Sequence, residues 1–545
     1  MGRRFGGVAG ILSVLFTLAG GCGGAPPERI GGVVLGSEVE APGPAATTYT
    51  ATPMAEPVVG PSDRVAAVER GLAAAWQSEH VALAGDGRLA TLASWVIERL
   101  GEGATLPPNE VVRFFAHHLG LPEQTPHLLM LGAADPATLE SGVHDSVVEY
   151  LRRQRYDAYG AAVVVRQGLT LVVVCLSVRP YELRPVPRHL GSHEAIAVRG
   201  RLGSAYGQPV FVVTHPDGHS ERLPAGRGPD FEVSVPTSAD GAHEVELLAD
   251  GPTGATVLAD FPVYVGVDVP RSVRLDAHRP TEGAASADGV RDELFRLLSE
   301  ERQRAGLAPL VVHDGLARVA LAHSTDMVEH DFVGHRSPTT GEPVDRLAAA
   351  GLSSGLVLEN IGRGYSARDV HDGLMRSPAH RANILNPDVT HVGIGVVVEM
   401  DGSRRAYLAT EVFVRMAQAI DVQRAPSDLL ARINQARAAR GAARLESDPN
   451  LEQAASQGAR DYFADRTLDQ QEVVDRASAS MRRFAIAYRR IGGVMAVVTT
   501  LDEAARLEPT FDPGLRYIGI GIAQGERPDQ PPNSIAVVLL FAWPR

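Results

Sequence analysis

The chain has 545 residues, of which 44% are hydrophobic and 21% charged, and its formal net charge at pH 7 is -13. A single hydrophobic core does not grow to that size, so the length predicts about three to five domains. Phosphate binding requires clustered Lys and Arg, and no predicted domain carries a basic stripe. The acidic balance therefore argues against a nucleic-acid partner.

The first 22 residues have the features of an export signal. Two arginines precede an apolar run at 8–18, and small residues lead from that run to Cys22. The run is too short for a permanent membrane-spanning helix, so the segment predicts a signal peptide that ends at a lipoprotein-type Cys. We expect Cys22 to be acylated and to anchor the protein to a membrane. The alternative is an ordinary signal peptide with an incidental Cys.

Residues 23–62 are rich in Pro, Gly, Thr and Ala and lack apolar periodicity, which predicts a flexible linker. The next segment, 63–180, begins with apolar residues at helical spacing and ends in a hairpin of apolar strands. Asp86 is placed to cap one of its helices. This segment is predicted to be a mixed α/β domain. Its one cysteine, Cys175, is expected to be buried.

Residues 181–270 have a different pattern. Short runs such as AIAVRGRL, PVFVVTHPDG and FEVSVP alternate with Gly, Pro and Asp turns, which predicts a small β-sandwich. We find no catalytic constellation in it. A module of this kind usually binds, spaces or supports its neighbours.

The pattern of 288–415 predicts helices followed by a closing hairpin, with Asp314 as a helix cap. Three polar clusters interrupt it, and they contain His335 (GHRSP), Glu359 (LENI) and His380 (SPAHRANIL). Nearby, Asn360 and Asn383 are expected to tie down backbone groups. His323 instead falls on the apolar face of a predicted helix, which favours a hydrogen-bonded core histidine.

Residues 416–545 repeat this pattern. GLAPLVVHDGL at 306–316 aligns without gaps with GAARLESDPNL at 441–451, and Gly-Ile-Gly recurs at 393–395 and 519–521. The last histidine of the chain is His391, so the second copy lacks the site histidines. We interpret it as a degenerate copy that docks beside the first and buries apolar surface against it. The 63–180 segment is a candidate for a third, more diverged copy.

The three clusters resemble those of the CAP superfamily (cysteine-rich secretory proteins, antigen 5, plant pathogenesis-related proteins) in the short form common in secreted bacterial proteins. The resemblance implies an α-β-α sandwich, and hence a multidomain α+β protein. In that family two histidines and two acidic residues line a central cleft. His335, Glu359 and His380 resemble the first His, the first Glu and the second His. Ser377 stands where the family has its second Glu.

This resemblance is the only reason to expect the three side chains to meet, because their spacing is long and irregular, unlike that of an HExxH helix. Two neutral imidazoles and one carboxylate form a partial shell for a divalent cation, preferably zinc, with a position open for water or ligand. The predicted metal ligands are His335, His380 and Glu359. A zinc-bound water would make hydrolysis chemically conceivable. Hydrogen-bonded structural histidines are the alternative.

Taken together, the sequence predicts a lipid-anchored protein of the bacterial cell envelope. Its ligand site comprises His335, Glu359, His380, Asn360, Ser377 and Asn383. The resemblance suggests a lipid, another small apolar ligand or an envelope protein as partner. A metal-dependent hydrolase or peptidase is one alternative, and a structural envelope scaffold without a site is another. Binding is favoured because the missing second acid weakens acid/base catalysis more than it weakens ligand binding.

Overall fold

In a computed structural model, the described residues are 29–544, apart from 31, 35, 55, 101–105, 276–285, 353, 402–403, 418, 482–487, 528–529 and 531–532. The predictions of a signal peptide and of acylation at Cys22 fall outside the described residues. Among those described, no helix combines the length and the apolar character needed to cross a bilayer.

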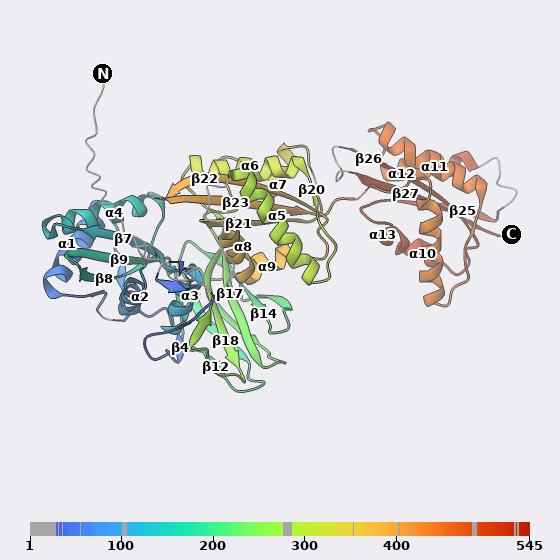
Figure 1. Cartoon of the computed structure of the whole chain (residues 1–545). Coiled ribbons are helices and arrows are strands. Elements are labelled where there is room, and N and C mark those ends of the chain that lie inside the picture. Colours follow the sequence, from blue (N-terminus) through green and yellow to red (C-terminus); the bar gives the residue numbers. More distant parts are fainter. Residues whose placement is uncertain are drawn as a thin grey trace, which may run out of the picture.

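The protein is a multidomain α+β protein with four folded units (Figure 1). Three mixed helix–sheet units occupy residues 62–177, 287–414 and 425–543, and a β-sandwich lies between the first two in the chain. We call them the first unit, the second unit, the third unit and the sandwich.

The second unit has an α-β-α arrangement around a four-stranded sheet of order β20-β22-β23-β21. Its elements are α5 (Ala287–Arg304), β20 (Val311–Val312), α6 (Asp314–Glu329), α7 (Pro343–Ala349), β21 (Val357–Gly364), α8 (Ala367–Arg376), α9 (Pro378–Ile384), β22 (His391–Asp401) and β23 (Arg404–Val414). Leu294, Leu298 and Phe413 belong to the core beneath α5 and α8. Leu316 and Leu347 belong to the core beneath α6 and α7. Helices therefore cover both faces of the sheet.

The first and third units have the same element order: a helix, a two-residue strand, two helices, a strand, a helix and a hairpin. In the first unit these are α1 (Ser62–Ser78), β6 (Ala84–Gly85), α2 (Gly87–Glu98), α3 (Asn109–His118), β7 (His127–Ala133), α4 (Leu139–Arg153), β8 (Ala158–Arg166) and β9 (Leu169–Ser177). In the third they are α10 (Ala425–Ala439), β24 (Glu446–Ser447), α11 (Pro449–Ala464), α12 (Gln470–Ser480), β25 (Arg490–Val498), α13 (Leu501–Ala505), β26 (Tyr517–Gly525) and β27 (Ser534–Trp543). In each unit the two-residue strand runs parallel to the first strand of the hairpin.

Glycines set the closest contact between helix and sheet in the second and third units. A Cβ on Gly395 of β22 would lie 2.0 Å from the backbone nitrogen of Leu321 in α6. A Cβ on Gly521 of β26 would likewise lie 2.0 Å from the carbonyl carbon of Ala455 in α11. Any side chain at these positions would push the helix off the strand. The recurring Gly-Ile-Gly therefore fixes the same packing in both units.

Of the two helix caps predicted above, Asp86 was right, and Asp448 caps a helix of the third unit in the same way. Asp86 and Asp448 each accept a backbone N–H in the first turn of the helix that follows. Asp314 was wrong, because α6 begins one residue earlier than expected. There the Nδ1 atom of His313 accepts the N–H of Leu316 at 3.3 Å.

The sandwich packs two antiparallel sheets around a common apolar core. The three-stranded sheet is β10 (Tyr181–Leu183), β13 (Ile196–Leu202) and β16 (Asp230–Val235). The other sheet has the order β12 (His189–Leu190), β18 (Gly254–Val265), β17 (Gly241–Gly251), β14 (Gly207–Thr214) and β15 (Ser220–Pro224), in which only β12 pairs in parallel. Phe211, Phe231 and Phe261 are buried between the sheets.

The prediction of a flexible linker at 23–62 was wrong for the described part of that segment. Three short strands pair with distant partners: β3 (Glu38–Glu40) with β19 (Ser272–Arg274), β4 (Thr48–Tyr49) with β11 (Val186–Pro187), and β5 (Val58–Val59) with β8. Tyr49 is fully buried in the core of the sandwich. The segment therefore joins the first unit to the sandwich.

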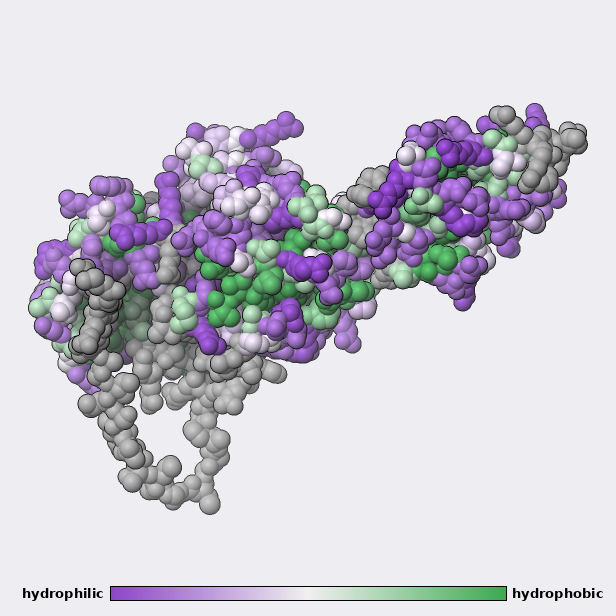
Figure 2. Space-filling model, turned by 90° about the horizontal axis from the view of Figure 1, so that it is seen from above, coloured by the Kyte–Doolittle hydropathy of each residue, from purple (hydrophilic) through white to green (hydrophobic). Residues whose placement is uncertain are grey.

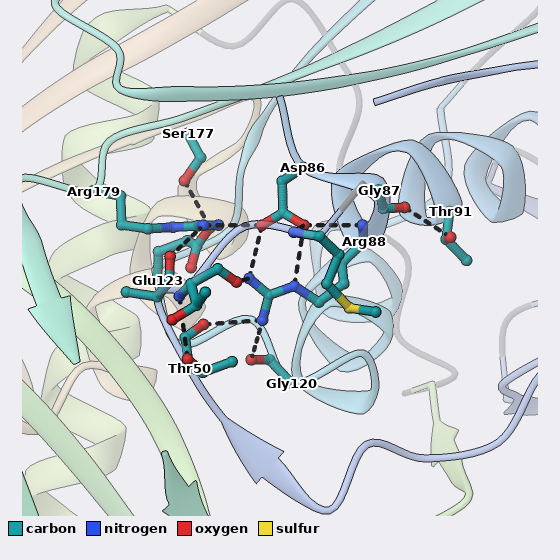
Figure 3. A network of polar contacts seen from close by, with 12 residues as sticks. Thr50, Asp86, Gly87, Arg88, Thr91, Gly120, Glu123, Ser177 and Arg179 are labelled. Carbon is teal, nitrogen blue, oxygen red and sulfur yellow. Dashed lines mark hydrogen bonds and ion pairs between the residues drawn. The ribbon is translucent and has the colours of Figure 1, made fainter. Parts of the chain in front are cut away.

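A buried ion-pair network in the first unit also holds this segment (Figure 3). Asp86 pairs with Arg88 at 2.7 Å and with Arg179 at 2.9 Å, and Arg179 also pairs with Glu123. Arg88 donates to the carbonyl of Thr50 at 2.9 Å. Two arginines balance two acids, so the network is internally neutral and ties residues near 50 to the first unit.

The third unit stands apart from the rest of the molecule (Figures 1 and 2). Its two apolar cores draw on residues from Ala417 onward. Within the described ranges these cores share no residue with those of the second unit. The expectation that this copy docks beside the preceding one was wrong. Its apolar residues are buried within its own two cores, between its sheet and its own helices.

Candidate functional site

The site is built around His335 and Glu359. His335 lies in the loop after α6, and Glu359 lies on β21. The Nδ1 atom of His335 is 2.9 Å from Oε1 of Glu359. The His335 side chain is 22% exposed, whereas that of Glu359 is only 2% exposed. His335 and Glu359, which come from two separate polar clusters, are therefore in direct contact, as the resemblance implies.

Arg346 holds the other oxygen of this carboxylate. Its Nη2 atom donates to Oε2 of Glu359 at 2.6 Å, and its Nη1 atom donates to the carbonyl of His335 at 2.9 Å. Burial acts to raise the pKa of Glu359, but the hydrogen bond from His335 and the positive charges of His335 and Arg346 lower it below its ordinary value. Glu359 is therefore a paired carboxylate.

His323 is a third residue close to the Glu359 carboxylate. It is fully buried on α6, with Nε2 at 3.0 Å from the carbonyl oxygen of Gly334 and 3.7 Å from Oε1 of Glu359. This agrees with the expected hydrogen-bonded core histidine. His117 and His118 in the first unit likewise contact backbone carbonyls, those of Asp260 and Gly43.

His380 reaches the site from α9, which two asparagines fix to the sheet. Asn360 donates to the carbonyl of His380 at 3.2 Å, and Asn383 donates to the carbonyl of Glu359 at 3.2 Å and to Oδ1 of Asn360 at 2.9 Å. Burial and the nearby His335 lower the pKa of His380 to about 3. His380 is therefore a neutral imidazole at physiological pH.

Ser377 caps α9 and contacts an acid that the sequence analysis missed. Its Oγ atom donates to Oε1 of Glu246 at 2.5 Å, and the N–H of Ala379 donates to Oε2 of the same residue at 2.8 Å. Glu246 lies on β17 of the sandwich and is fully buried. The available signal was an acidic residue inside the apolar run HEVELLADG.

Glu411 is a second missed residue. It lies on β23 next to Asn360, which donates to its Oε2 atom at 3.1 Å. The side chain is fully buried, and its Oε1 atom has no hydrogen-bond partner among the residues that the structure describes. Burial raises the pKa of Glu411 to about 7. Its only described hydrogen bond comes from a neutral amide, whereas Glu359 is paired with Arg346.

The predicted three-ligand metal set fits this arrangement poorly. Both oxygens of Glu359 are engaged, one of them by the guanidinium of Arg346, which repels a cation. In the described part of the chain, no group of three or more His, Cys, Asp or Glu side chains is arranged to hold a metal ion. A cation at this site would rest on His335 and His380.

A comparison with protein-family models matches residues 295–414 to the cysteine-rich secretory protein family, CAP. The second unit is a CAP domain. This agrees with the resemblance that the three polar clusters indicate. The match ends at the last strand of the sheet and includes His335, Glu359 and His380.

Two curated relatives from Bacillus subtilis (strain 168) each match part of this chain. The uncharacterized protein YkwD is 37% identical over 118 residues, which are 22% of this chain and 46% of that protein. The uncharacterized membrane protein YlbC is 34% identical over 105 residues, which are 19% of this chain and 30% of that protein. The chain thus spans less than half the length of either relative.

Solved structures were also compared with the whole chain. An outer surface protein from Borrelia burgdorferi shares 20% identity at a TM-score of 0.22, covering 24% of this chain and 96% of its own. An extracellular protein containing a SCP domain from Bacillus anthracis str. Ames shares 18% identity at a TM-score of 0.22, covering 43% of this chain and 86% of its own.

Proposed function

We propose that this protein is an envelope-attached binding protein whose CAP domain takes a small apolar or lipid-like ligand at His335 and His380. The observation that supports this most directly is the state of the site's acid. Glu359 is already bonded to His335 and Arg346, and His380 is a neutral imidazole, so the site offers no unpaired carboxylate base at Glu359. Such a site suits recognition of a neutral ligand better than proton transfer.

Exposed apolar residues near the site support an apolar ligand. Val333 is 58% exposed two residues before His335, and Val344 is 54% exposed at the start of α7. Figure 2 shows apolar side chains gathered over the middle of the molecule, where the CAP domain lies. Contact with such side chains contributes roughly 25 cal/mol per Å² of apolar area that a ligand covers.

Attachment to the outside of a bacterial membrane is part of the proposal. It rests on the apolar run and Cys22 at the start of the chain, which predict an acylated N-terminus. A Cys22→Ser protein is expected to lose membrane partitioning in detergent extraction. If it still partitions with membranes, the anchor lies elsewhere.

The binding site is tested with a fluorescent long-chain fatty acid as the probe. We expect saturable binding by the full chain and at least a tenfold weaker affinity for the His335→Ala, His380→Ala double variant. The matched control replaces His144 and His189, which lie outside the CAP domain, and should bind like the wild type. Equal affinity for all three proteins would show that the histidines do not form the site.

The metal-dependent hydrolase remains the second candidate, and it requires a cation at His335 and His380. Calorimetric titration of zinc into the wild type and into the double variant tests this requirement without any substrate. An identical heat for wild type and double variant would remove the metal, and with it the hydrolase.

A further inference from the structure

Elements of three units meet beside the CAP site around a group of acids, of which Glu246 and Asp260 are buried. The sandwich contributes Glu244 and Glu246 from β17 and Asp260 from β18. The first unit contributes Arg113 of α3, which contacts Asp260 at 2.9 Å and Glu244 at 3.3 Å. We call these three acids the carboxyl cluster. The cluster contains three acids, and among the described residues Arg113 is the one arginine that pairs with it directly.

Glu246 extends from this cluster into the CAP domain. Both of its oxygens accept hydrogen bonds from the first turn of α9, one from Oγ of Ser377 and one from the N–H of Ala379. Ala379 directly precedes His380. A residue of the sandwich therefore holds the helix that carries a site histidine.

The hairpin turn between β17 and β18 contacts the segment of the other site histidine. The N–H of Arg336 donates to the carbonyl of Thr253 at 2.8 Å. A Cβ on Gly254 would lie 3.3 Å from Cβ of His335, and one on Gly334 would lie 2.4 Å from Thr253. One strand pair of the sandwich thus touches the segments of both histidines.

We propose that Glu246 is a positioning residue of the CAP site: from the sandwich, it latches the first turn of α9 and so sets the position of His380 relative to His335. The inference relies on the proposed function only in treating His380 as a site residue. The latch itself consists of contacts within the protein and exists whether or not a ligand binds.

The groups around Glu246 make this latch sensitive to pH. Glu244 lies on the same strand, Asp260 lies opposite on β18, and Arg113 approaches from α3. Arg376 at the end of α8 adds a positive charge that acts on Asp260. From α9, only Ser377 and the backbone of Ala379 reach Glu246 in the contacts described.

Burial and the neighbouring Asp260 raise the pKa of Glu246 from 4.5 to about 8, and burial raises that of Glu244 to about 7. These pKa values are above those that the same carboxyl groups would have if α9 were separated from the sandwich. The state in which α9 is bound to Glu246 therefore favours the protonated carboxyl. The latch is then strongest below pH 4.5 and weakens as pH rises toward 8. For one such group, the ratio of latched to released protein falls about 100-fold between pH 5.5 and pH 8.5.

Hydrogen exchange of the α9 backbone in the full chain tests the proposal. After correction for intrinsic exchange, wild-type protection of residues 379–385 should fall about 100-fold from pH 5.5 to pH 8.5. Glu246→Gln keeps the shape of the side chain and removes its titration, so protection of residues 379–385 should change much less between the two pH values than in the wild type. The control Glu232→Gln, on the exposed face of β16, should behave as the wild type does.

A second variant guards against misfolding of the first. Ser377→Ala removes one donor to Glu246 and should lower α9 protection at pH 5.5 while β22 and β23 stay protected. The proposal is overturned if wild-type α9 protection does not change with pH, or if Glu246→Gln retains the wild-type change. Neither readout involves fatty acid or zinc, so failure of the proposed function would leave both results unchanged.

Discussion

Ser377 and Glu246 lie 131 residues apart in the chain, yet they share a 2.5 Å hydrogen bond across the boundary between the CAP domain and the sandwich. Ser377 also caps α9 by accepting the N–H of His380 at 3.4 Å. A capping residue normally serves only its own helix. Here it also carries the contact between two domains.

Removing Arg346 should destabilise the CAP domain strongly. Arg346→Ala leaves the buried carboxylate of Glu359 without its cation, and breaking a buried pair typically costs about 3–5 kcal/mol. Chemical denaturation should show this loss in the transition of the CAP domain. The control Arg296→Ala, on the exposed face of α5, should leave this transition nearly unchanged, because exposed ion pairs contribute little to stability. Similar losses for both variants would mean that Arg346 does not compensate Glu359.

Glu411 should make the CAP domain less stable at alkaline pH. In the folded protein the pKa of Glu411 is raised from 4.5 to about 7. Protonation of Glu411 therefore stabilises the folded state fully below pH 4.5, and this stabilisation is lost as pH rises through 7. Glu411→Gln should flatten this dependence and gain about 2–3 kcal/mol over the wild type between pH 5 and pH 8. Urea denaturation across that range measures the difference. Parallel pH curves for the two proteins would contradict the assignment.

Gly395→Ala should loosen the packing of α6 on the sheet. Its Cβ would lie 2.0 Å from the backbone of Leu321, so the helix must shift, at a cost of at least about 2–3 kcal/mol. Gly373→Ala in α8 is the matched control, because no atom lies within 4 Å of the added Cβ. Helix propensity should make that control about 0.5–1 kcal/mol more stable. Thermal denaturation of both variants shows whether a loss of stability comes from the close approach of α6 to β22 at Gly395 or from replacing a glycine as such.

Deleting residues 420–545 should leave the rest of the protein unchanged. The third unit shares no apolar core with its neighbours in the described ranges, so little buried surface is exposed by its removal. Calorimetry should give the same melting temperature for the remaining units, and the melting transition of the third unit should disappear. A lower melting temperature of the remainder would reveal docking in solution.

Local features of the fold were predictable because their causes are local. The caps at Asp86 and Asp448 and the Gly-Ile-Gly strand of each later unit follow from a few neighbouring residues. The candidate site was predictable only through resemblance, which placed His335 beside Glu359 correctly. Nothing in the spacing of the two residues requires their contact.

The remaining features depend on partners far away in the chain. The strands β3, β4 and β5 contain only two or three residues each, and they form because edges of β19, β11 and β8 are available. Glu246 was missed for the same reason, since its importance comes from α9 and not from its own strand. The low exposure that gives the Arg346–Glu359 ion pair its energetic weight could not be predicted from the sequence either.

The separation of the third unit also affects how a macromolecule would reach the CAP domain. The first and third units lie at opposite ends of an elongated molecule (Figure 1). With an acyl anchor at the N-terminal end, the unit projecting farthest from the membrane would be the one without a single histidine. An approaching macromolecule would meet that outermost unit first and would have to pass it to reach the imidazoles of the CAP domain.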